Sequence, residues 1–229
     1  MNVVRLAVAA LALTASLGAR AGVVIEGVAE EKPQRILMEG QQLRIDTDGS
    51  HAVVFDGATK RSLQLDLEKK TYTEITKEDL AKIQAMMKQA GAAAPPKPRT
   101  PRYEKTGKSE QVLGKRCDVY RIAESDGTSS DEMCIAPFGT FGVERADLGG
   151  FRALGEFASD MTGGDGFEKS WADVPGLPLA SWEVEDGERR ETFRATKVEK
   201  RAVPASEFDA PAGWKKNPGF AEQMKQLGR

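Results

Sequence analysis

"HAVVFDGATKRSLQLDLEKKTYTEIT", residues 51–76, is the stretch of the chain that decides its fold class. Phe55 leads into an Asp-Gly pair at 56–57, and leucines then stand at every second position from Leu63 to Leu67. A repeat of two residues points alternate side chains to opposite faces, which is typical of a half-buried antiparallel strand. The stretch therefore predicts adjacent antiparallel strands joined by short turns.

Segments of the same kind, rich in Val, Ile and Leu, precede and follow this stretch. Gly, Pro and charged residues separate them, as is typical of strands and their turns. The strongest turn signal is Asp186-Gly187, which predicts a long hairpin. About nine to eleven strands are expected, in "GVVIEGVAEE", "QRILMEG", "QQLRIDT", the opening stretch, "RYEKTGKSEQVLG", "KRCDVYRIA", "DEMCIA" and "LPLASWEVEDGERRETFRATKVEKRAV".

Two segments predict helices. Thr76 opens the first, since its hydroxyl can accept a hydrogen bond from the amide of Asp79, and this helix is expected to end at Gly91. The second covers residues 145–161, where apolar residues recur at spacings of three and four. We expect the apolar faces of both helices to lie against the sheet and to line a cavity, through Leu80, Ile83, Met86, Met87, Leu148, Phe151, Leu154, Phe157 and Met161.

Together these elements predict an α+β fold. We expect a curved antiparallel sheet that forms an incomplete β-barrel, with the helices covering its concave face. Strands of the same kind flank the proline-rich residues 91–101, so this segment is an insertion within a single domain, residues 22–229. The space between such a sheet and its helices can hold an apolar ligand.

The first 21 residues have the pattern of a secretory signal peptide. A basic Arg5 precedes an apolar run over 6–17, and Ala19 and Ala21 have the spacing of a cleavage site. The run is too short to span a bilayer, and no later segment is longer, so no transmembrane segment is expected. We expect a periplasmic protein. The net charge of −2, which becomes more negative when the leader is removed, argues against a nucleic-acid partner.

The two cysteines, Cys117 and Cys134, are expected to form a disulfide, because export exposes them to an oxidising compartment. Two registers of their hairpin are possible. A two-residue turn at 126–127 would place Cys134 opposite Val119, with the sulfurs on a diagonal. A four-residue loop, "ESDG", would place the cysteines directly opposite each other, and we predict this second register.

Residue types that catalyse reactions or bind metals do not gather in the sequence. His51 is the sole histidine and stands in a turn without a nucleophile motif. Zinc needs four ligands, and the cysteines with His51 give three at most. Asp46 and Asp48 lack the later ligands of a calcium loop, and the glycines of 163–166 lack the lysine of a phosphate loop. We therefore expect no catalytic residue, metal or cofactor, and a protein that is not an enzyme.

A basic cluster follows the first predicted helix. Lys97, Arg99, Arg102, Lys105 and Lys108 stand in and after the proline-rich segment, with Glu104 the one acidic residue among them. Such a cluster can contact anionic lipid head groups or an acidic partner. The alternative interpretation of the cluster is a solvated loop, since lysine and arginine keep exposed loops and sheet edges soluble.

Three segments carry a resemblance to a known family: "LRIDTDGSHAVVFDGATKRSLQLDLEKKTYTEIT", "VLGKRCDVYRI" and "PASEFDAPAGWKK". They resemble an exported bacterial family known only as a domain of unknown function and, more distantly, periplasmic carriers of outer-membrane lipoproteins. The matching motif residues are Arg44, Asp46, Lys70, Thr71 and Tyr72.

The resemblance implies a half-barrel with a hydrophobic cavity and adds no catalytic residue. We expect a non-enzymatic periplasmic module that binds a lipid-like or other hydrophobic ligand, with a lipid or lipidated protein as partner. The alternative is a protein-interaction or envelope-sensing factor that uses a sheet edge or the basic loop.

Overall fold

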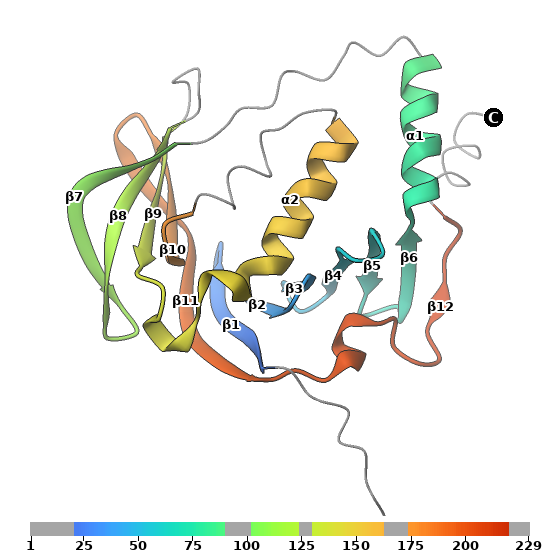
Figure 1. Ribbon diagram of the computed structural model, residues 1–229, viewed down its shortest axis with the longest axis horizontal. Helices are drawn as coiled ribbons and strands as arrows, with labels where there is room; N and C mark the ends of the chain where they lie inside the picture. The colour runs from blue at the N-terminus through green and yellow to red at the C-terminus, as the bar shows by residue number, and fades with distance from the viewer. Residues whose placement is uncertain (1–20, 90–101, 124–129, 163–173, 220–229) are drawn as a thin grey trace, which may run out of the picture.

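A computed structural model describes residues 21–89, 102–123, 130–162 and 174–219. Within these ranges twelve strands form one curved sheet (Figure 1). The strands are β1 (Ala21–Ala29), β2 (Lys32–Glu39), β3 (Gln42–Thr47), β4 (His51–Asp56), β5 (Arg61–Asp66), β6 (Thr71–Ile75), β7 (Arg102–Val112), β8 (Lys115–Ala123), β9 (Ser130–Ala136), β10 (Leu177–Glu185), β11 (Glu188–Ala202) and β12 (Lys215–Lys216). The helices are α1 (Lys77–Gln89) and α2 (Gly149–Thr162), with short 3-10 turns η1 (Thr140–Gly142), η2 (Arg145–Leu148) and η3 (Ala205–Phe208).

The sheet consists of two antiparallel halves. Its order is β12-β6-β5-β4-β3-β2-β1-β11-β10-β9-β8-β7, so pairing between β1 and β11 joins the half β1–β6 to the half β7–β11. The predicted hairpin turn is confirmed: Asp186 and Gly187 have φ of 50° and 84°, the left-handed backbone that a two-residue hairpin turn needs. The sheet does not close, because β7 and β12 each have one neighbour.

A large curved antiparallel sheet with few helices is therefore confirmed, although one strand differs from expectation. The two-residue β12 pairs with β6 in parallel, and the twelve strands exceed the expected number. The sequence around Lys215 has no alternating apolar pattern. The pairing of β12 with β6 therefore follows from the path of the C-terminal chain and not from a local sequence pattern.

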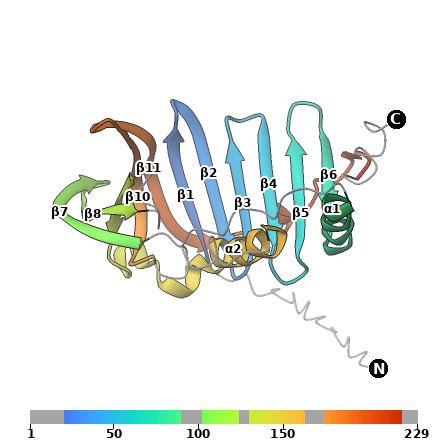
Figure 2. The ribbon, with the colours of Figure 1, turned by 90° about the horizontal axis from the view of Figure 1, so that it is seen from above.

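Helix α2 packs on one face of the sheet, at one end of β2–β4 (Figures 1 and 2). The ring of Phe157 lies 4.9 Å from that of Phe55, and a Cβ on Gly57 would lie only 2.4 Å from that of Ala153. The concave face is defined here as the face of β1–β6 that carries Phe55. Wider cover of this face by both helices stays a prediction.

Helix α1 begins as predicted. The Asp79 amide donates to the Thr76 hydroxyl at 3.2 Å, while the Thr76 amide and hydroxyl donate to the Asp79 carboxylate at 3.1 and 2.9 Å. These reciprocal bonds satisfy backbone donors that have no partner within the helix. The end predicted at Gly91 lies outside the described residues.

The convex face is covered by a C-terminal strap, residues 203–217 (Figure 1). Phe208 is fully buried there against residues such as Val54 and Leu65. Glu207 accepts a hydrogen bond from Arg44, which also pairs with Asp46 at 2.7 Å. Both faces of the central strands are thus buried, each by a different segment.

The motif residues that carried the family resemblance hold this strap. Arg44 and Asp46 anchor η3, as described above. Further along, the carbonyls of Lys70 and Tyr72 accept hydrogen bonds from the amides of Lys215 and Asn217 at 3.2 and 2.7 Å. Thr71 accepts a further hydrogen bond from the Asn217 side chain at 3.2 Å. In this structure the residues of the family motif hold the C-terminal strap on the convex face of the sheet.

The predicted disulfide is confirmed, but the predicted register is wrong. Cys117 and Cys134 are bonded with their Cα atoms 5.2 Å apart, yet Cys134 pairs with Val119. The right-handed twist of a strand pair brings one diagonal closer than the other, so a disulfide does not require directly opposed residues. Ala123 pairs with Ser130, which is the register expected of a turn centred on 126–127.

Several predictions fall on residues outside the described ranges. They concern the signal peptide (1–20 of its 21 residues), the proline-rich 91–101, the glycines of 163–166, and the side chains of Lys97 and Arg99. The single domain also stays a prediction. Within the described part of the chain, no helix is both long and apolar enough to cross a membrane.

Candidate functional site

A row of apolar residues crosses the concave face of the first half-sheet. Strand register aligns Ile25, Ile36, Ile45 and Val53 on β1, β2, β3 and β4. The first two are buried, Ile45 is half-buried, and Val53 is 41% exposed. Helix α2 lies at one end of these strands in Figure 2. The row therefore runs from the core to an apolar side chain in contact with solvent.

The same surface continues onto the second half-sheet through Phe193 on β11. A Cβ on Gly27 would lie 2.5 Å from the Phe193 ring, so the glycine leaves the space that this ring occupies. Phe193 pairs with Ser181, Ser181 with Met133, and Met133 with Tyr120. Because paired residues point to the same side, the half-buried Phe193, Met133 and Tyr120 share one face. We call Tyr120, Met133, Phe193, Ile45 and Val53 the apolar strip.

A polar rim borders this strip. Two shallow depressions meet at Thr192, whose hydroxyl lies 2.8 Å from that of Ser181. Arg190 pairs with Glu30 at 3.2 Å and also with Glu183. The depressions are lined by Asp131, Met133, Ser181, Trp182, Glu183, Arg190 and Thr192, and by Ala29, Glu30, Lys32, Pro33, Gln34, Thr47, Asp48 and Thr192.

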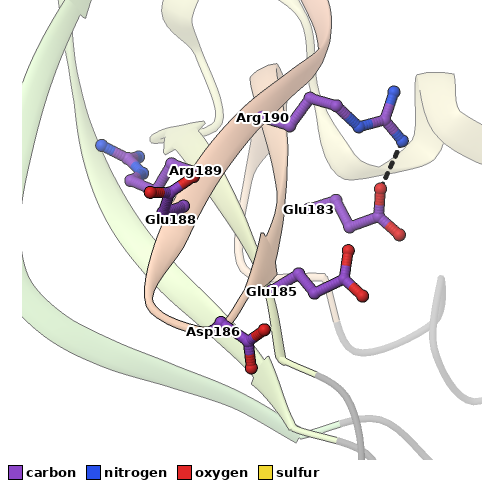
Figure 3. Close-up of a pocket in the computed structure, with 6 residues that line it drawn as sticks. All are labelled: Glu183, Glu185, Asp186, Glu188, Arg189 and Arg190. Atoms are coloured by element: carbon purple, nitrogen blue, oxygen red, sulfur yellow. Dashed lines mark hydrogen bonds and ion pairs between the residues drawn. The ribbon is translucent and has the colours of Figure 1, made fainter.

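The tip of the β10–β11 hairpin forms a further open depression with acidic character (Figure 3). The bond between Arg190 and Glu183 raises the pKa of the Arg190 guanidinium. Figure 3 shows the side chain of Glu185 extending to the same side of the hairpin as that of Glu183, with Asp186 at the turn. The tip adds negative charge to the rim, with a lining of Glu183, Glu185, Asp186, Glu188, Arg189 and Arg190.

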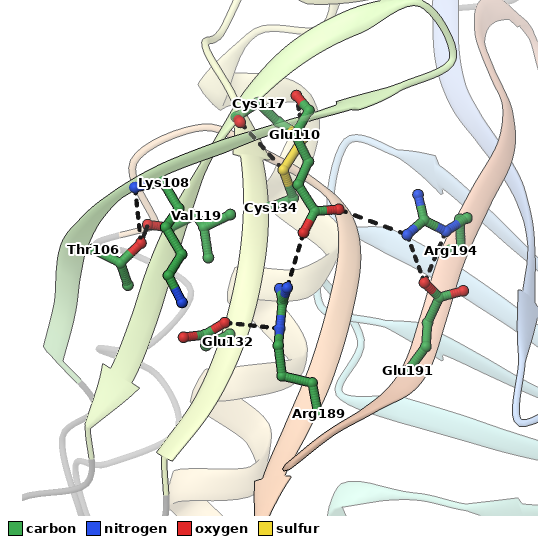
Figure 4. Close-up of polar contacts among 10 residues, drawn as sticks. All are labelled: Thr106, Lys108, Glu110, Cys117, Val119, Glu132, Cys134, Arg189, Glu191 and Arg194. Carbon is green, nitrogen blue, oxygen red and sulfur yellow. Dashed lines mark hydrogen bonds and ion pairs between the residues drawn. A yellow bond between two sulfur atoms is a disulfide. The ribbon is translucent and has the colours of Figure 1, made fainter. Parts of the chain in front are cut away.

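A cluster of charged residues lies next to the disulfide (Figure 4). Two of its members, Arg189 and Arg194, lie over the ring of Trp182. The Arg189 guanidinium lies 3.9 Å from the centre of the Trp182 ring and 3.0 Å from Glu110. Arg189 Nε lies 3.0 Å from Oε2 of Glu132, a side chain that is 7% exposed. That oxygen is out of hydrogen-bond alignment, so the contact is an ion pair alone. Arg194 contacts Glu110 at 3.8 Å and Glu191 at 2.6 Å.

This cluster connects strands that are not neighbours in the sheet. Arg189 and Arg194 belong to β11, Glu132 to β9 and Glu110 to the edge strand β7. Its ion pairs therefore fix the curl of the second half-sheet. The hydrogen bond to Glu191 raises the pKa of Arg194, so this residue stays charged in the cluster. The sequence contains no local signal for this site, because its members lie on three strands that are far apart along the chain.

His51 stands at the surface, as its turn predicted. Its side chain is 61% exposed, and Nδ1 lies 2.8 Å from the Ser50 hydroxyl and 3.6 Å from Asp48. Hydrogen bonds from the Ser50 hydroxyl and amide lower the pKa of Asp48 to about 2. Asp46 belongs to the strap anchor on the other face. Among the described residues, no group of three or more His, Cys, Asp or Glu side chains is placed to hold a metal.

The predicted lining residues occupy different environments. Leu80, Leu148 and Phe157 are buried in the main core, whereas Phe151 and Leu154 on α2 are half-buried. Side chains of four further predicted residues are outside the described part of the chain, although their backbone belongs to α1 or α2: Ile83, Met86, Met87 and Met161. A ligand-lining role stays a prediction for all nine.

Three residues of the predicted basic cluster are described, and all are exposed on β7. Lys105 bonds to Asp118 at 2.8 Å, which raises the pKa of the lysine and lowers that of the aspartate. Arg102 and Lys108 lie on either side of it along the strand. β7 bulges between Lys105 and Ser109, where Gly107 has a φ of 80°. A bulge and exposed lysines are devices that keep an edge strand from pairing with another chain.

Comparison with known proteins shows the family but no function. The family model that matches is described as "Domain of unknown function (DUF4412)" and covers residues 25–214. The comparison with curated proteins gives no match.

Solved structures with a similar arrangement have low identity to this chain. They include PNGF-II in a C2 crystal form, with 10% identity, a TM-score of 0.39 and coverage of 90% of this chain and 32% of that one. MucB has 13% identity, a TM-score of 0.36 and coverage of 86% and 60%. MucB in complex with MucA(peri) has 12% identity, a TM-score of 0.32 and coverage of 85% and 54%. This chain thus spans about a third of the PNGF-II chain and 60% of the MucB chain.

Proposed function

Since this chain belongs to the DUF4412 family, which is described without a function, we propose a function from the geometry of the concave face. The protein is a non-enzymatic binding module that takes a lipid-like or other hydrophobic ligand on this face. The acyl part of the ligand lies along the apolar strip, and its polar part contacts the rim around Thr192. Pockets that combine an apolar surface with a few polar groups at one end suit amphiphiles of this kind.

The observation that carries the proposal is the exposure of Val53 at the end of a continuous apolar row. Exposed apolar side chains that stand alone are common on protein surfaces. Val53, however, extends a row that includes Ile45 and the buried Ile36. Phe193 and Met133 continue that surface on the second half-sheet. Contiguous apolar surface bordered by polar residues is typical of a binding site.

Helices α1 and α2 complete the proposed site. Phe151 and Leu154 are half-buried on α2, near the sheet. They would cover a ligand on its outer side, with the helices over the concave face. The same role stays a prediction for Ile83, Met86, Met87 and Met161, whose side chains lie outside the described residues. Methionine suits this role because its flexible, polarisable side chain adapts to different apolar shapes.

The proposed location is the periplasm. A disulfide between the two fully buried cysteines is typical of proteins that fold in an oxidising compartment. The leader pattern of residues 1–21 supports the same location. A periplasmic module that shields acyl chains would take a lipid or the lipid group of a lipidated protein as partner.

Native mass spectrometry of the protein purified from its own host tests the proposal. We expect a bound lipid on the wild-type protein and its loss in Val53→Asp, because a carboxylate in the strip would have to lose its hydration. Val28→Asp is the matched control: Val28 is also 41% exposed, and the alternation of β1 places it on the convex face. Lipid-free wild-type protein, or equal lipid loss in both variants, would contradict the proposal.

The alternative function, a partner bound at a sheet edge, has less support. The bulge at Gly107 and the exposed lysines of β7 oppose strand addition at this edge. The edge strand β12 has only two residues, Lys215 and Lys216. Neither edge therefore offers a long, flat template for another chain.

A further inference from the structure

Two bulky apolar residues of this chain adopt a backbone conformation that they usually avoid. Eight non-glycine residues in the described ranges have a positive φ, and six of them are charged. The other two are Leu113, with φ of 54°, and Phe141, with φ of 57°. Left-handed backbone at a bulky residue is an outlier, because Cβ then crowds the carbonyl oxygen.

Leu113 stands at the tip of a hairpin, where the turn itself gives no reason for a leucine. It precedes Gly114 in the turn between β7 and β8, and both have positive φ. Asn and Asp are the residues that such a turn prefers before Gly. Leu113 is also 38% exposed. Leu113 thus combines an unfavourable backbone conformation with an exposed apolar side chain, and a single substitution by Asn would remove both.

Phe141 lies close to the same hairpin tip. Lys115, two residues after Leu113, places its ammonium 6.0 Å from the centre of the Phe141 ring. The Arg145 guanidinium lies 4.9 Å from the ring of Phe138. Figure 1 shows the β7–β8 turn beside the segment that follows β9, at the lower left. We call Leu113, Lys115, Arg116, Phe138, Phe141 and Arg145 the tip patch.

The chemistry of the tip patch fits the interface of a lipid bilayer. Lys115, Arg116 and Arg145 are exposed, although the whole chain carries a net negative charge. Half-buried phenylalanine rings lie beside two of these cations, Phe141 next to Lys115 and Phe138 next to Arg145, and the exposed Leu113 precedes Lys115 by two residues. Apolar side chains enter the boundary of the acyl region, while basic residues attract anionic head groups, at about 1 kcal/mol for each Lys or Arg.

We propose that the tip patch is a membrane-contact surface that docks on anionic bilayers, with Leu113 inserted below the head groups. The inference stands on residues outside the apolar strip and does not depend on the proposed ligand. It accounts for the left-handed leucine: the conformation holds an exposed apolar side chain in the turn of the β7–β8 hairpin. If the concave face also binds lipid, the tip patch brings it to a source of that lipid.

Cosedimentation with vesicles tests this docking. We expect the full mature chain to bind vesicles of equal parts phosphatidylglycerol and phosphatidylcholine at low salt, and not vesicles of phosphatidylcholine alone. Leu113→Asn should weaken binding about fivefold, because half-exposed apolar surface is lost. Its thermal midpoint should not fall, since Asn suits the left-handed turn. Lys115→Glu combined with Arg116→Glu should weaken binding by about tenfold or more.

Val28→Asn is the control, because Val28 is similarly exposed and lies away from the tip, and its vesicle binding should equal that of the wild type. Vesicle binding by Leu113→Asn that equals that of the wild type would overturn the proposal. Wild-type protein that binds an acidic protein but not anionic vesicles would also overturn it. A variant that loses vesicle binding but still carries lipid from its host would separate this surface from the proposed ligand site.

Discussion

At the scale of single residues, the buried carboxylate of Glu132 depends on Arg189 for its opposite charge. The Glu132 side chain is 7% exposed, and its nearest cation is Arg189 at 3.0 Å. A buried charge is tolerated only when it is paired, and loss of its partner typically destabilises a protein by several kcal/mol. Trp182, stacked beneath the guanidinium, limits access of water that could replace it.

Replacing Arg189 with alanine should therefore lower the free energy of unfolding by about 3 kcal/mol, measured by urea denaturation. Arg190→Ala is the matched control on the same strand, because Arg190 is 61% exposed and its loss should cost less than about 1 kcal/mol. A double variant, Glu132→Leu with Arg189→Met, should recover most of the lost stability. Equal stability of Arg189→Ala and Arg190→Ala would show that the buried pair stabilises the fold no more than an exposed one.

At the scale of elements, the cap of α1 has a pH dependence whose sign follows from its hydrogen bonds. The Thr76 amide and hydroxyl donate to the Asp79 carboxylate, and these bonds lower the pKa of Asp79 below its usual 3.8. A carboxyl group with a lowered pKa in the folded state stabilises the fold above its ordinary pKa. That contribution is lost as the pH falls through the lowered value.

Asp79→Asn should thus destabilise the protein by about 1 kcal/mol at neutral pH. The difference from the wild type should persist at pH 5 and shrink as the pH falls below 3.8 through the lowered pKa of the wild-type carboxyl. Urea unfolding at pH 7, 5 and 3 measures it. A difference that stays constant down to the lowest pH would mean that the charge of Asp79 has no part in the cap.

Element by element, the sequence predicted what local patterns encode. Alternation in "SLQLDL" predicted β5, the Asp-Gly pair at 186–187 predicted the β10–β11 hairpin, and Thr76 predicted the start of α1. The C-terminal strap was not predicted, because Phe208 is buried against strands that lie more than a hundred residues earlier. The apolar strip was also missed, although alternation in β8 already placed Tyr120 on the face opposite the buried Val119.

At the scale of the whole molecule, the chain crosses between the two halves of the sheet and then returns. The strap passes from the end of β11 over the convex face to β12 beside β6, so it ties the centre of the sheet to one edge. The second half-sheet has no such strap in the described ranges. It is held by the Arg189 cluster and by the disulfide, which joins β8 to β9.

The disulfide should therefore contribute to the stability of the whole domain. Closing a loop between cysteines 17 residues apart is worth about 3 kcal/mol in the chain-entropy model. We expect the double variant Cys117→Ala, Cys134→Ala to have a free energy of unfolding about 3 kcal/mol lower in urea denaturation. A reductant should lower the urea midpoint of the wild type but not that of the variant. Since both cysteines are fully buried, the native protein should resist alkylation even with reductant until it unfolds. Fast alkylation of the folded protein in the presence of reductant would mean that the half-sheet opens, and that the ion cluster alone does not hold it.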